Sequence, residues 1–198
     1  MTNGTTTRVS LLIRIRDAED DDAWTQFSQV YGPLLYRYAR KHSLQDADAA
    51  DLTQEVLREV AKAIGDFEYN PQIGKFRSWL FTVARYMLNR IRTRTNRQPA
   101  ATGDSLVREA LADAPAASLE DSAFWEEEYE QRLFEWAAEE ICGQFQESTW
   151  LAFWKTAVDG KKPKDVAHEL SLSVGSVYVA KNRVLARLKE KINEVDDQ

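Results

Sequence analysis

The 198-residue sequence contains one cysteine, two histidines and no long apolar run. Cys142 cannot form a disulfide within the chain, and so few thiol and imidazole groups argue against a structural zinc site. No stretch approaches the roughly 18 apolar residues that a membrane span requires, and the first ten residues lack the pattern of a secretory signal. We therefore expect a cytoplasmic protein with no membrane insertion, metal or cofactor.

The acidic and basic residues are segregated along the chain. The net charge of -6 alone would argue against a nucleic-acid partner, but the distribution of charged residues along the chain matters more. Residues 74–97 carry seven Lys or Arg and no carboxylate, residues 98–147 carry thirteen Asp or Glu against two Arg, and residues 160–191 carry eight basic side chains against three acidic ones. This pattern predicts two DNA-facing segments that flank an acidic stretch.

Apolar spacing predicts an all-α fold of two small helical domains joined by a flexible acidic linker. In the first domain we expect a helix from about Trp24 to His42 with a kink or short break at Gly32-Pro33, and a second helix that ends at Gly65. A basic helix then extends to about Arg94. Its apolar stripe favours core packing for most of its rings, whereas its outward arginines suit nucleic acid.

The C-terminal part has the turn chemistry of a helix-turn-helix, the expected form of the second domain. Ser118 opens a capping box, Pro163 suits the first turn of a short helix, and Ser173 can cap a longer one. The expected organisation is an N-terminal segment (1–20), a first domain (21–97), a linker (98–122) and a second domain (123–198). A basic helical hairpin without DNA contacts is the structural alternative.

Three stretches resemble bacterial RNA polymerase sigma factors of the sigma-70 family, extracytoplasmic-function type. They are DAADLTQEV at 48–56, FRSWL at 76–80 leading into VAR at 83–85, and LSVGSV at 172–177. The resemblance extends from about Trp24 to Ile192. It implies a dissociable subunit that binds core RNA polymerase through the largest-subunit clamp helices and the flap, and binds promoter DNA. It leaves open an anti-sigma factor as a further partner.

The resemblance also assigns roles to individual residues. Polymerase binding falls to Asp51, Leu52, Gln54 and Glu55. Binding and melting of the -10 element fall to Phe67, Lys75, Phe76, Arg77, Tyr86, Asn89 and Arg90. Reading of the -35 element falls to Ser176, Tyr178, Val179, Asn182, Arg183 and Arg187. Tyr86 and Arg90 stand where the family usually has Asn and Asp, so we expect an altered -10 preference.

Two other functional classes compete with this interpretation. An autonomous helix-turn-helix transcriptional regulator would bind duplex DNA without polymerase. An α-helical enzyme is disfavoured because His42 and His168 are isolated and the sequence has no phosphate-binding loop. We therefore expect a protein without catalytic residues.

Overall fold

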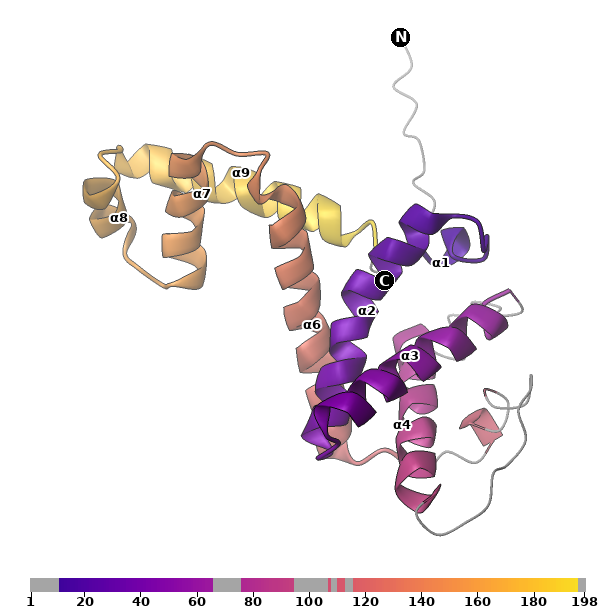
Figure 1. Cartoon of the computed structure of the whole chain (residues 1–198). Coiled ribbons are helices and arrows are strands. Elements are labelled where there is room, and N and C mark those ends of the chain that lie inside the picture. Colours follow the sequence, from indigo (N-terminus) through magenta and orange to yellow (C-terminus); the bar gives the residue numbers. More distant parts are fainter. Residues whose placement is uncertain (1–10, 66–75, 95–106, 108–109, 113–115, 196–198) are drawn as a thin grey trace. The chain divides into compact units, whose positions relative to one another are not determined.

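The computed structural model describes residues 11–65, 76–94, 107, 110–112 and 116–195. Within these ranges the regular structure is helical, which confirms the predicted all-α class (Figure 1). The chain divides into two compact units, and the division falls between Arg132 and Leu133. The predicted -10 contacts Phe67 and Lys75 lie outside the described residues.

The first unit contains α1 (Leu11–Arg14), α2 (Asp21–Lys41), α3 (Asp46–Ala63) and α4 (Phe76–Arg94). Asp20 accepts a hydrogen bond from the amide of Ala23, which caps α2. The same carboxylate binds the guanidinium of Arg14 at 2.7 and 2.9 Å, which fastens α1 to the start of α2. Capping and ion pairing by one side chain therefore fix the N-terminal turn.

α2 continues through Pro33, so of the kink or short break expected at Gly32-Pro33 the break is absent. Proline has no amide hydrogen, so the carbonyl of Gln29, four residues earlier, loses its usual helical donor. The Nε of Arg132 donates to this carbonyl at 3.1 Å. A side chain from a distant part of the sequence thus satisfies the group that proline leaves unpaired.

Aromatic side chains fill the core of the first unit. Phe27 packs at 4.6 Å from Tyr31 and 5.9 Å from Phe76 between ring centroids, and all three are buried. On α4 the predicted stripe is buried at Leu80, Val83 and Met87 and half-buried at Trp79 and Ile91. The rings of Phe27, Tyr31 and Phe76 are therefore core residues.

α6 (Leu119–Cys142) contributes to both units. The Oγ of Ser118 accepts a hydrogen bond from the amide of Asp121 at 3.0 Å, which confirms the predicted cap. Residues up to Arg132 belong to the first unit, so the structural division lies later in the chain than the predicted linker at 98–122. The first half of α6 is therefore a fourth long helix of the first unit.

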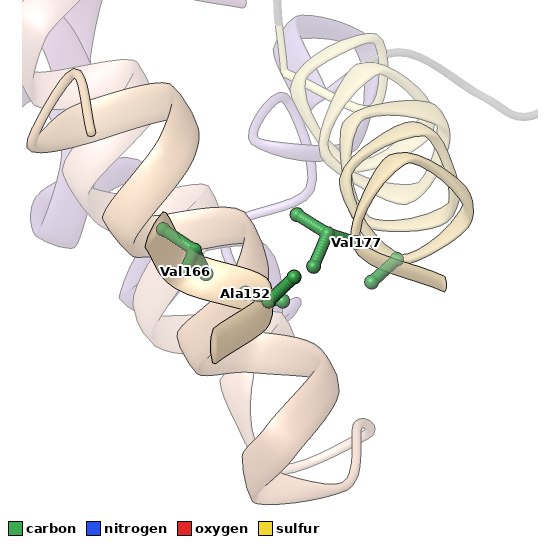
Figure 2. Close-up of a cluster of buried hydrophobic side chains, with 5 residues drawn as sticks. Ala152, Val166 and Val177 are labelled. Atoms are coloured by element: carbon green, nitrogen blue, oxygen red, sulfur yellow. The ribbon is translucent and has the colours of Figure 1, made fainter. Parts of the chain in front are cut away.

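The second unit comprises the rest of α6, α7 (Glu147–Phe153), the π-helix η1 (Trp154–Val158), α8 (Pro163–Glu169) and α9 (Val174–Ile192). A buried cluster joins α7, α8 and α9 (Figure 2), and its members are Ala152, Val166, Ala167, Val177 and Ala180. The N-terminal cap of α9 is Ser173, whose Oγ accepts from the amide of Ser176 at 3.0 Å. The predicted pair of helices is thus present, with Pro163 at the first position of α8.

Replacing Ser173 by Ala should lower the free energy of unfolding of the second unit by about 1 kcal/mol, because an amide in the first turn of α9 loses its acceptor. Urea unfolding followed by circular dichroism measures the loss. Ser148→Ala, an exposed position within α7, is the matched control. An equal loss of unfolding free energy in both variants would show that the cap of Ser173 does not stabilise α9.

Candidate functional site

The polar side of α3 is a solvent-exposed surface. Asp51 and Gln54 are exposed and Glu55 is half-buried. Leu52, assigned with them to polymerase binding, is only 1% exposed and packs in the core. The helical period explains the separation, because Leu52 lies on the same side of α3 as Val56. Of the four residues assigned to polymerase binding, the three polar ones are therefore accessible.

Two of the residues assigned to the -10 element point into the first unit. Phe76 is 2% exposed and packs edge-on against both Phe27 and Tyr31. The side chain of Arg77 is 14% exposed, pairs with Glu126 at 3.2 Å and lies 4.4 Å above the ring of Tyr129. In this structure α6 therefore covers Arg77.

The remaining polar side chains of α4 fall on two flanks of the helix. Arg92 lies on the flank of Arg77 and donates to the backbone carbonyl of His42 at 2.7 Å. On the helical period Tyr86 and Arg90 fall on the opposite flank, with Asn89 exposed between the two. The assigned -10 residues on α4 consequently do not form a single surface.

The outer face of α9 combines apolar and polar side chains. Tyr178 is 53% and Val179 67% exposed, and Asn182 is also exposed. Exposed apolar groups on a helix can contact a thymine methyl, and an amide such as that of Asn182 can pair with an adenine edge. This face therefore has the chemistry of a base-reading surface.

Three other residues assigned to the -35 element make intramolecular contacts. The hydroxyl of Ser176 lies 2.8 Å from that of Ser173. The guanidinium of Arg183 lies 5.8 Å from the ring of Phe145, and Arg187 binds Gln144 at 2.9 Å and Glu190 at 3.1 Å. Arg187 thus connects α9 to the turn after α6.

An ion cluster that the sequence analysis did not anticipate fixes α8. Glu169 lies 2.8 Å from the Nζ of Lys155 in η1 and 2.9 Å from that of Lys161 in the turn. The hydrogen bonds from Lys155 and Lys161 lower the pKa of Glu169 to about 2. Spacings of eight and fourteen residues across a turn give no periodic signal, so the sequence alone does not reveal this cluster.

The described residues contain no group of three His, Cys, Asp or Glu side chains placed to hold a metal ion. None of the helices in these ranges is long and apolar enough to span a lipid bilayer.

Comparison with known proteins identifies relatives of the chain. Residues 28–97 match the family described as Sigma-70 region 2, a range that contains most of α2 and all of α3 and α4. The chain is also similar to the ECF RNA polymerase sigma factor BldN of Streptomyces coelicolor, with 28% identity over 116 residues. That match covers 58% of this chain and 43% of BldN, so the chain spans less than half of this relative's length.

The lowered pKa of Glu169 predicts a pH-dependent contribution to stability. The folded state favours the carboxylate, so the stabilisation is present above the ordinary pKa of 4.5 and is lost as the pH falls towards about 2. Glu169→Gln should lower the melting temperature at pH 7, and the difference from the wild type should shrink between pH 4.5 and 2. Thermal unfolding monitored by circular dichroism tests this, with Glu130→Gln as an exposed control. A difference that persists at pH 2 would contradict it.

Proposed function

We propose that the chain is a dissociable promoter-recognition subunit of RNA polymerase, a sigma factor of the sigma-70 family and the extracytoplasmic-function type. In this role it binds the core enzyme, reads the -35 and -10 elements and helps to melt the DNA. The observation that carries the proposal is the match of residues 28–97 to Sigma-70 region 2. The matched helices bear both the polar surface of α3 and the basic helix α4.

The proposed polymerase-docking surface is the exposed side of α3. Asp51, Gln54 and Glu55 project away from the apolar core of the first unit. Two carboxylates and an amide can pair with basic and polar groups of a partner helix without disturbing the fold. Leu52 supports this surface from inside by fixing the position of α3.

For the -10 element we propose Tyr86, Asn89 and Arg90, together with Phe67 and Lys75 from the preceding segment. A ring and a guanidinium four residues apart on one flank of α4 can stack on an unpaired base and bind a phosphate. Tyr86 and Arg90 replace the Asn and Asp usual in the family, which supports a changed base preference. Phe76 then has a structural role, and Arg77 requires the displacement of α6.

For the -35 element we propose the exposed face of α9. Val179 and Asn182 occupy its centre, with Tyr178 and Arg183 on its edges. The α8–α9 pair can place this face in the major groove. Ser176 and Arg187 would contribute by holding the start and the middle of α9 in position.

Promoter-dependent transcription with purified core polymerase tests the proposal directly. We expect the chain to co-purify with the core enzyme and to start transcripts at defined sites on a promoter template. Specific binding of promoter duplex without polymerase, and no transcription with it, would instead favour an autonomous regulator.

The docking surface predicts a binding defect without loss of fold. Asp51→Lys combined with Gln54→Ala and Glu55→Ala should abolish co-purification with core polymerase, while the melting temperature stays close to that of the wild type because the changes are on the surface. Glu127→Lys with Glu130→Ala, at exposed positions on α6, is the control. Full polymerase binding by the α3 variant would reject the assignment.

Variants of the two proposed DNA-facing surfaces should have different defects in transcription initiation. Asn182→Ala and Arg183→Ala should each reduce discrimination at the -35 element by about 1 to 3 kcal/mol, because each removes a base-edge contact. Tyr86→Ala and Arg90→Ala should instead impair opening, which permanganate footprinting detects. A template with a pre-melted bubble should rescue only the second pair. Equal defects on duplex and bubble templates would exclude a role in melting.

A further inference from the structure

The first half of α6 (Leu119–Arg132), here called the cover, lies on one face of α2 and α4. Its rings are among the most deeply buried groups of the first unit, since Trp125 and Tyr129 are each 1% exposed. These two rings pack against the rings of Tyr31 and Tyr38 of α2 and of Phe81 of α4. We call these three rings and the nearby Arg37, Lys41 and Arg77 the basic face.

The charges of the cover complement those of the basic face. Asp121 lies 3.2 Å from Lys41, Glu126 lies 3.2 Å from Arg77, and Glu128 lies 3.1 Å from Arg37. The sequence of α4 has no carboxylate, and neither does that of α2 from Leu34 to Lys41. Three anionic groups of the cover thus neutralise cations that have no acidic neighbour on their own stretch of helix.

The rings of the cover stack on rings of the basic face. Trp125 and Phe81 are 5.0 Å apart with an interplanar angle of 27°, and Tyr129 and Tyr31 are 5.8 Å apart at the same angle. Single-stranded nucleic acid binds proteins through this combination of phosphates on cations and bases on aromatic rings. The cover therefore presents the same two kinds of group that a single strand presents.

The contacts between the cover and the basic face can be replaced by contacts with a ligand. The ion-paired side chains retain partial exposure, up to 51% at Glu126 and 38% at Arg37, so salt screens them. The indole nitrogen of Trp125 is buried with no hydrogen-bond partner among the described residues. An unsatisfied buried donor weakens the packed state relative to one in which water reaches the indole.

We infer that the cover is an autoinhibitory element that competes with single-stranded DNA for the basic face. When the cover leaves, Arg37, Lys41 and Arg77 become available to phosphates, and the rings of Tyr31 and Phe81 to bases. The inference rests on the proposed function, in which α4 binds the opened strand. It adds that access to one flank of that helix is regulated within the chain.

The helix supplies a matched pair of variants for the test. Glu126→Gln/Glu128→Gln removes two carboxylates that contact the basic face. Glu127→Gln/Glu130→Gln removes two exposed carboxylates from the same helix with the same change in net charge. Circular dichroism of both full-length proteins establishes that the helix content is unchanged.

Fluorescence anisotropy with a labelled thymidine 20-mer then measures binding by the free chain. We expect the first variant to bind about three- to tenfold more tightly than the second, because only the first weakens the cover. The gain should be smaller for a duplex of the same length, whose bases cannot stack on the rings. Equal affinities of the two variants for the single strand, or an equal gain for the duplex, would overturn the inference.

Hydrogen exchange provides an independent readout. Saturating the wild-type chain with the thymidine 20-mer should accelerate exchange of the amides of Leu119–Arg132, because the cover is displaced. Unchanged exchange under saturation would overturn the inference. Neither assay contains polymerase, so failed transcription with the expected binding and exchange rejects only the sigma-factor role. Successful transcription, together with equal affinities of the two variants for the single strand, rejects only the autoinhibitory role of the cover.

Discussion

The first unit depends on the burial of aromatic rings between α2, α4 and the first half of α6. Most of the stability of a helix in a protein comes from the packing of its apolar face rather than from helix propensity. Tyr38 illustrates the point, because its buried ring packs edge-on against both Phe81 of α4 and Trp125 of α6. Burial raises the pKa of Tyr38 above that of an exposed tyrosine, because the phenolate form would lose its hydration. Ion pairs from α6 to α2 and α4 surround this ring cluster.

Local chemistry made much of the fold predictable. Pro163 and Ser173 begin α8 and α9 as their types suggest, and the inward residues of α9 follow the helical period. Such features depend on neighbours within one or two turns, which a sequence displays directly. The exposed polar residues of α3 were predictable for the same reason, because Asp51 and Gln54 lie opposite the apolar stripe.

What lies against each buried stripe could not be predicted in this way. The apolar residues of α6 have one continuous spacing, so nothing in that pattern separates Trp125, which packs in the first unit, from Trp136, which packs in the second. Arg77 belongs to a run of basic residues and was therefore expected to face solvent or DNA. Its actual neighbours, Glu126 and Tyr129, come from the distant acidic stretch, and no local pattern in the sequence pairs that stretch with α4.

Packing and electrostatics give the cover and a DNA strand different responses to salt. Binding of single-stranded DNA releases counterions, so its affinity falls steeply as the salt concentration rises. Salt weakens the ion pairs of the cover, but it leaves the burial of Trp125 and Tyr129 and the hydrogen bond from Arg132 to Gln29 nearly unaffected. Higher salt therefore shifts the competition towards the cover. In this chain Pro33 contributes to that balance. It leaves the carbonyl of Gln29 without a helical donor, and Arg132, the last residue of the cover, donates a hydrogen bond to that carbonyl.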